Sequence, residues 1–207
     1  MRQYLAMMNE LERIKIATRI RAFNIIERQV IGSITLYFEQ RDNVWVNTLI
    51  SVARPEIEKL AKELGVSDKV IFYSDHIAQY PEYLQGMKPH DYLNRVRGLM
   101  AHPLNPNNHR PEIFPDAFDP ANLILCAIFD LMKFHDALDM ETPPEMCAFG
   151  LWHIAVSPDH GNQGLDMTNQ YRILRDIRSQ SSSEQRRRGL KFMNWFVAQS
   201  AKQTAEA

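Results

Sequence analysis

The stretch Ile16–Phe38, IATRIRAFNIIERQVIGSITLYF, carries the pattern that decides the fold of this chain. Its apolar side chains recur three or four positions apart, at Ile16, Ile20, Phe23, Ile26, Val30, Ile34 and Phe38. This spacing places them on one face of an α-helix of about six turns. Most of the basic residues in the stretch lie off that face. The stretch therefore predicts a long amphipathic helix with one side against a core.

A second apolar stripe follows a short polar break at Gln40–Asn43. Its members are Val46, Leu49, Ile50, Ala53, Ile57, Leu60 and Leu64. Gly65 follows the stripe at the position where helices commonly end in a left-handed residue. Pro55 lies inside the stripe and predicts a kink or a split into two helices. Two long helices joined by so short a link indicate an antiparallel helical hairpin.

Helical patterns continue along the rest of the chain. We expect helices over 90–102, 121–138 and 144–156, and two more after a loop at 157–166, the last opened by a capping box from Ser181 to Glu184. The sequence therefore predicts an all-α fold in a single domain over 1–207. Its four-helix-bundle core would span about 10–156, and additional C-terminal helices would span about 167–203.

Composition limits the classes of function. The chain has 207 residues, 45% apolar and 24% charged, and a formal net charge of −1. Such a charge draws the chain neither to nucleic acid nor to an anionic membrane, so phosphate recognition would need a local basic patch. Apolar runs fall short of the ~18 residues that span a bilayer. The cysteines, Cys126 and Cys147, are expected to be buried free thiols of a reducing compartment. We therefore predict a cytoplasmic protein without a membrane partner.

One candidate site lies at the predicted end of the helix over 90–102. Arg95, Arg97 and His102 form both Arg-x4-His and Arg-x6-His, and Pro103 ends the helix beside the histidine. Arg95 precedes His102 by about two turns and so shares nearly the same face. A cation and a titratable imidazole there could bind and cut a phosphodiester. The alternative is that the histidine caps the helix while the arginines are solvated.

A second candidate site is a basic run near the C-terminus. Arg186, Arg187 and Arg188 are followed by Lys191 and Trp195. Cations next to an aromatic ring could contact RNA phosphates and a base. The alternative is a solvated helix face, which Glu184 and Gln185 also favour.

Several blocks of the chain, in order, resemble a family of uncharacterised bacterial helical proteins. They are Leu36–Asp42, Val46–Leu49, Lys62–Gly65, Leu99–His102, Phe118–Pro120 and Pro144–Trp152. The arrangement is also similar to the HEPN superfamily, four-helix-bundle domains with an Arg-x4–6-His motif, many of which are dimeric, metal-independent endoribonucleases. Asn47 stands where the family has histidine. Ala101 and Pro103 replace its lysine and alanine on either side of His102.

The resemblance implies roles for the motif residues. His102 would act as a general acid or base on the ribose 2′-OH or the leaving oxygen, and Arg97 or Arg95 would hold the phosphate. Two sets would meet in a homodimer, with RNA as the substrate and no metal or other cofactor. Many superfamily members instead serve as interaction modules, so a non-catalytic helical protein that dimerises or binds a partner protein is the main alternative.

A metal-dependent phosphohydrolase of the His-Asp type is a further alternative. It would need at least three of His76, His90, Asp91, His102, His109 and His135 around one point. The spacing of these residues gives no helical pair of ligands, and we expect His135, near a helix end, to be a partly exposed surface residue.

Overall fold

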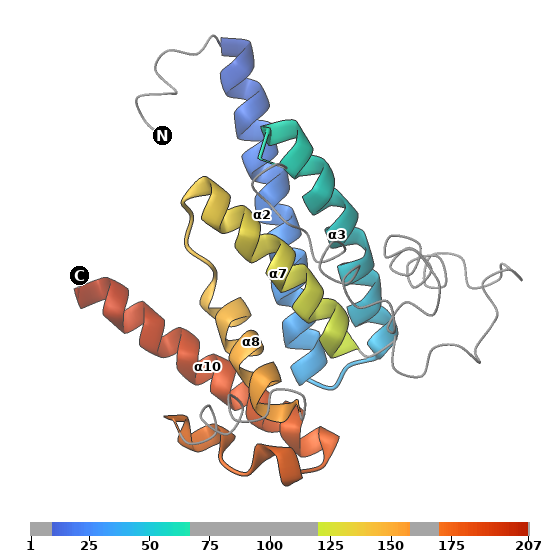
Figure 1. The fold of residues 1–207 in the computed structure, drawn as a ribbon, viewed down its shortest axis with the longest axis vertical. Coiled ribbons are helices and arrows are strands. Elements are labelled where there is room, and N and C mark those ends of the chain that lie inside the picture. Colours follow the sequence, from blue (N-terminus) through green and yellow to red (C-terminus); the bar gives the residue numbers. More distant parts are fainter. Residues whose placement is uncertain (1–9, 67–119, 158–169, 207) are drawn as a thin grey trace, which may run out of the picture.

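The computed structural model describes residues 10–66, 120–157 and 170–206, and every element in these ranges is helical (Figure 1). The all-α class expected from the apolar periodicity is confirmed for these residues. None of the helices in these ranges is long and apolar enough to cross a membrane.

The first two helices form the hairpin predicted from the two apolar stripes. Helix α2 spans Glu10–Phe38 and helix α3 spans Asn43–Leu64. They lie antiparallel, because the short link joins them at one end while Arg19 Nε lies 3.6 Å from Glu63 Oε2 towards the other. The hairpin brings the apolar faces of both helices into one core.

Two details of the hairpin bear on the sequence analysis. Pro55 lies inside α3 without splitting it, with Ala53 and Ile57 buried on either side, so burial of the apolar face compensates for the missing backbone donor. Ile20, expected in the apolar stripe of α2, is 42% exposed. The stripe is buried from Phe23 onward, where other helices cover it.

Helix α3 ends in a left-handed residue at Gly65, as the sequence predicts. Gly65 has a φ of +68°, its N–H donates to Lys62 O at 3.2 Å, and the Val66 N–H donates to Ala61 O at 3.0 Å. These two bonds define a Schellman motif, in which the left-handed residue is usually glycine because it has no Cβ.

Helix α7, Pro120–Leu138, packs against both helices of the hairpin. Its Phe134 ring stacks on Phe23 of α2 with centroids 4.7 Å apart. The colour gradient of Figure 1 shows that α7 runs in the same direction as α3 and opposite to α2. As a result, α3 ends and α7 begins at opposite ends of the bundle.

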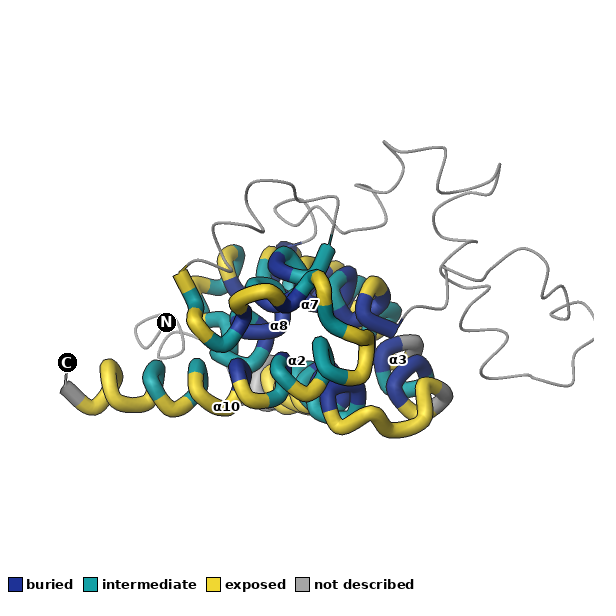
Figure 2. The backbone as a smooth tube through the Cα atoms, turned by 90° about the horizontal axis from the view of Figure 1, so that it is seen from below, coloured by how far each residue is buried: buried dark blue, intermediate teal, exposed yellow. Residues whose placement is uncertain are grey.

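The C-terminal part of the chain covers one end of this core. Helix α8, Pro144–Val156, presents Trp152 to Phe38 with centroids 4.9 Å apart. Two 3₁₀ turns, η4 (Arg172–Leu174) and η5 (Ile177–Ser179), lead into α10, Ser182–Glu206. Figure 2 shows α10 crossing the bundle with its last, mostly exposed turns extending beyond it. The helices predicted at 121–138, at 144–156 and at the end of the chain are confirmed. The other helix expected after the loop at 157–166 is replaced, over the described residues before α10, by the two 3₁₀ turns.

Candidate nucleic-acid interface

The Arg/His motif cannot be placed in this fold. Arg95, Arg97 and His102 all lie in 67–119, outside the described residues, so their proximity stays a prediction. The second candidate site, the basic run, lies in the first turns of α10 and is described in full.

The first turn of α10 is organised by Ser181 and Glu184. The Ser181 hydroxyl accepts a hydrogen bond from the Glu184 N–H at 3.3 Å, as expected for the residue before a helix. The Glu184 carboxylate accepts from Arg187 Nε and Nη2 at 2.6 Å each, and from Arg188 Nε at 2.9 Å. These bonds, first those from Arg187 and then that from Arg188, lower the pKa of Glu184 to about 2. They also raise the pKa of Arg187.

The other arginine of the run faces the bundle. The Arg186 guanidinium lies 4.3 Å from the centre of the Tyr37 ring of α2, a cation–π contact. Its Nε is buried and has no hydrogen-bond partner among the described residues. Arg186, Arg187 and Arg188 therefore all contact their own chain, whereas Lys191 lies exposed one turn further along.

Close packing explains why this turn of α10 lies on α2. A Cβ built on Gly189 would lie 2.8 and 2.9 Å from Cδ1 and Cζ of Phe38, so only glycine lets the helix approach this ring. The Trp152 indole N–H donates to Gln185 O at 3.0 Å and joins α8 to the same turn. The start of α10 is thus held by ring contacts and hydrogen bonds as well as by its arginines.

Beside α10 lies a group of cationic and aromatic side chains, of which the sequence predicted only Lys191 and Trp195 as neighbours. Arg188 Nη1 donates to Arg175 O at 2.8 Å, and the Tyr171 ring meets the Trp195 ring edge-on with centroids 6.0 Å apart. The segment 171–175 therefore lies along α10 in the opposite direction. We name as the basic–aromatic surface Tyr171, Arg172, Arg175, Lys191 and Trp195.

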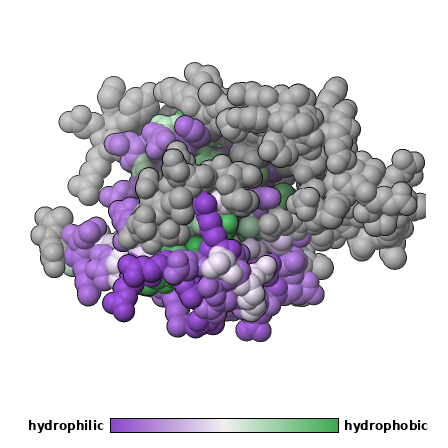
Figure 3. Space-filling model, turned by 60° about the horizontal axis from the view of Figure 1, so that its bottom comes forward, coloured by the Kyte–Doolittle hydropathy of each residue, from purple (hydrophilic) through white to green (hydrophobic). Residues whose placement is uncertain are grey.

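The sequence did not predict the part of this surface that lies on the segment 171–175, for a physical reason. Only Lys191 and Trp195 lie on a helix whose periodicity can be read from the sequence. Arg172 and Arg175 lie in or beside a 3₁₀ turn, whose apolar pattern is too short to show which way its side chains face. The only available signal was the clustering of basic residues at Arg172, Arg175 and Arg178. The described residues in the view of Figure 3 present mostly hydrophilic side chains.

Of the residues proposed for the metal alternative, His135 is the one that lies in the described ranges. His135 is fully buried, which corrects the expectation of a partly exposed surface residue. Its Nε2 lies 2.8 Å from Glu27 Oε1 of α2, and the edge of its ring meets Phe23. The described residues contain no group of three His, Cys, Asp or Glu side chains that could hold a metal. His76, His90, Asp91, His102 and His109 all lie outside these residues.

A second buried polar contact joins α3 to α7. Arg54 Nε and Nη2 donate to Asp130 Oδ2 at 3.3 and 3.4 Å, and the two side chains are 12% and 4% exposed. Asn47, two helical turns before Arg54 on α3, is also buried, and its Oδ1 has no hydrogen-bond partner among the described residues. Arg54 and Asp130 therefore form a pair in the core only because α3 and α7 pack against each other.

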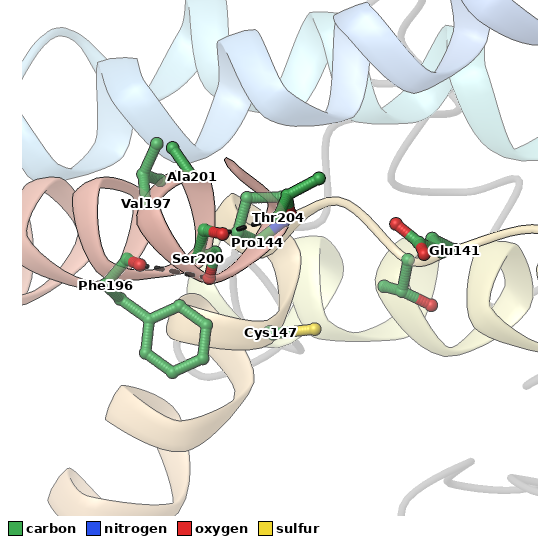
Figure 4. A pocket seen from close by; sticks show the side chains of 9 residues that line it. Glu141, Pro144, Cys147, Phe196, Val197, Ser200, Ala201 and Thr204 are labelled. Carbon is green, nitrogen blue, oxygen red and sulfur yellow. Dashed lines mark hydrogen bonds between the residues drawn. The ribbon is translucent and has the colours of Figure 1, made fainter. Parts of the chain in front are cut away.

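A pocket of about 520 Å³ lies between α10 and the start of α8 (Figure 4). Phe196, Val197 and Ser200 of α10 face Pro144 and Cys147 across it. The Ser200 hydroxyl is occupied, because it donates to Phe196 O at 3.1 Å. Burial raises the pKa of Cys147, and the nearby Glu145 adds to this shift, so the thiol stays protonated and is a poor nucleophile. Both cysteines are free thiols; Cys126 is buried and Cys147 half-buried.

Comparisons of the chain with models of protein families, with curated proteins and with solved structures gave no match.

Proposed function

We propose that this chain is a HEPN-like protein that binds and cleaves RNA without a metal ion. The observation that supports the proposal is the direction of the described helices. An up-down-up-down bundle places a helix of opposite direction between two parallel ones. Helices α3 and α7 are parallel, and the sequence between them carries the predicted helix over 90–102 with the Arg/His motif.

The motif residues have complementary roles in the proposed cleavage. His102 takes the proton from the ribose 2′-OH or gives one to the leaving 5′ oxygen. Arg97 or Arg95 binds the phosphate and stabilises the negative charge that develops on its oxygens. A two-fold dimer supplies two such sets, one from each subunit.

The test is cleavage of mixed RNA in the presence of EDTA. We expect the purified chain to cut RNA with chelator present, and His102→Ala to lose at least ~100-fold of the rate, in line with the removal of a general acid or base. His109→Ala, in the same stretch but outside the motif, is the matched control and should keep the wild-type rate. Absence of cleavage by the wild-type chain, or equal loss in both variants, would overturn the proposal.

A non-catalytic interaction module is the second candidate, favoured by two observations on the described residues. All three arginines of the basic run contact their own chain, and Trp45 on α3 is 67% exposed. Contact of Arg186, Arg187 and Arg188 with RNA stays a prediction, since RNA would have to compete with Glu184 and Tyr37. A stable dimer by light scattering, abolished by Trp45→Glu without loss of helical content, together with no RNA cleavage, would favour this candidate.

A further inference from the structure

We propose that the basic–aromatic surface binds single-stranded RNA, with Trp195 stacking on a base and Arg172, Arg175 and Lys191 contacting phosphates. The choice of RNA as the ligand rests on the function proposed above. The proposal concerns residues remote in sequence from the Arg/His motif and so can fail or succeed separately. It replaces the three arginines of the basic run with cations that the fold leaves accessible.

Trp195 has the properties of a stacking platform. Trp195 is 41% exposed, and its ring contacts the rings of Tyr171, Phe192 and Phe196. Tyr171 meets it edge-on, and Phe192 lies 6.0 Å away with the two planes inclined by 26°. A ring already fixed by its neighbours loses little conformational freedom when a base stacks on it.

The cations lie beside this ring because the segment 171–175 runs along α10. The bond from Arg188 to Arg175 O fixes one end of that segment, and the contact between Tyr171 and Trp195 fixes the other. Arg172 and Arg175 are exposed on this segment, and Lys191 is exposed one helical turn before Trp195. The nearest acid on α10, Glu184, is already bound to Arg187 and Arg188, so it does not neutralise these cations.

This chemistry favours a single strand over other anionic partners. Stacking on an aromatic ring needs a base whose face is free, which a duplex does not offer. An anionic membrane would require cations around an apolar wedge rather than a ring braced by other rings. The carboxylates of an acidic protein would pair with the cations but offer no flat ring to stack on the indole.

The experiment measures binding of a fluorescein-labelled oligouridine to the full-length His102→Ala chain, in which cleavage is removed. Trp195→Ala should weaken binding by about 5-fold to 100-fold, the range for loss of one base–aromatic stack. Phe129→Ala removes a similarly exposed aromatic ring from α7, outside every proposed site, and should leave binding unchanged. Lys191→Gln should reduce the slope of log K against log salt by about 0.7, whereas Lys59→Gln on α3 should not.

The outcomes separate this proposal from the cleavage proposal. RNA cleavage by the wild-type chain with unchanged binding in Trp195→Ala and Lys191→Gln would overturn the surface and leave the cleavage proposal standing. Trp195-dependent binding without cleavage by the wild-type chain would overturn the cleavage proposal and support the surface. Stronger binding to duplex RNA, or binding to phosphatidylserine vesicles but not to oligouridine, would also overturn the surface. Lys191 is exposed, so its variant keeps the test valid if Trp195→Ala fails to fold.

Discussion

Glu184 binds two of the three arginines that the sequence predicts as an anion-binding patch. A row of three arginines reads as an anion-binding patch in the sequence. In the fold, one carboxylate accepts hydrogen bonds from two of them, and a tyrosine ring takes the third. The single carboxylate offsets one of the three positive charges, and all three guanidinium groups are engaged within the chain, whereas Arg172, Arg175 and Lys191 are exposed on the basic–aromatic surface.

The lowered pKa of Glu184 predicts a specific acid sensitivity. A carboxyl group whose pKa is lower in the folded chain stabilises the fold above its unfolded pKa of about 4.5, and this contribution is lost as pH falls towards 2. Glu184→Gln should therefore be less stable than wild type at pH 6, and the difference should shrink as pH falls from 4.5 to 2.5. Urea unfolding followed by circular dichroism at each pH measures it. A difference that stays constant over this range would contradict the assignment.

Gly189 supports a second prediction at the scale of one residue. Alanine normally favours a helix interior over glycine, but here its Cβ would overlap the Phe38 ring, which is itself enclosed by Phe149 and Trp152. We expect Gly189→Ala to lower the free energy of unfolding by about 1–3 kcal/mol, the usual cost of overpacking.

The control for this substitution is another helical glycine. Gly150 of α8 has nothing within 4 Å of a Cβ built on it, so Gly150→Ala should raise the free energy of unfolding by up to ~1 kcal/mol. Urea titration of both variants gives the comparison. Stabilisation by Gly189→Ala would show that Phe38 moves aside without cost.

At the scale of elements, the helices α2, α3 and α7 end in the same way. The residues at Gln40, Gly65 and Asp139 all have a positive φ near +60°, and each is followed by the pair of backbone bonds of a Schellman motif. Only Gly65 could be recognised from the sequence, because only glycine marks a left-handed position by its identity. At Gln40 the helix end is also held by tertiary contact, since Ser183 Oγ donates to Gln40 Oε1 at 2.7 Å.

The ion pair between α3 and α7 supports a prediction about how elements are joined. Asp130→Ala leaves the Arg54 guanidinium nearly buried without its carboxylate, which should lower the free energy of unfolding by about 3–5 kcal/mol. The double variant Arg54→Met with Asp130→Leu removes both charges and should recover more than half of that loss. Thermal unfolding of the three chains provides the measurement. A double variant as unstable as Asp130→Ala would show that the contact is not mainly electrostatic.

At the scale of the whole molecule, α2, α3 and α7 form a three-helix bundle in which each helix contacts the other two, with α8 and α10 across one end (Figure 1). Within this arrangement, the C-terminal helix carries both a structural and a proposed binding role. Its first turns pack against α2 and α8, and Lys191 and Trp195 lie on its exposed side. The proposed RNA surface therefore depends on α10 being fixed at its start.

Local periodicity in the sequence was sufficient to predict the long helices, because apolar residues at helical spacing must share one buried face wherever that face packs. It also identified the end of α3 at Gly65, since the backbone geometry there is a property of glycine itself. Neither conclusion needed knowledge of a neighbouring element.

Contacts between distant segments were settled only by the tertiary structure. Three outcomes depend on which helix lies opposite. They are the burial of His135 against Glu27, the burial of Phe23 but not of Ile20, and the contact of Arg186 with Tyr37. A helix pattern shows which side chains share a face, but not whether a given polar member of that face meets solvent or a partner. For that reason the helices and the candidate Lys191 were predictable from the sequence alone, whereas the exposed Arg172 and Arg175 beside them were not.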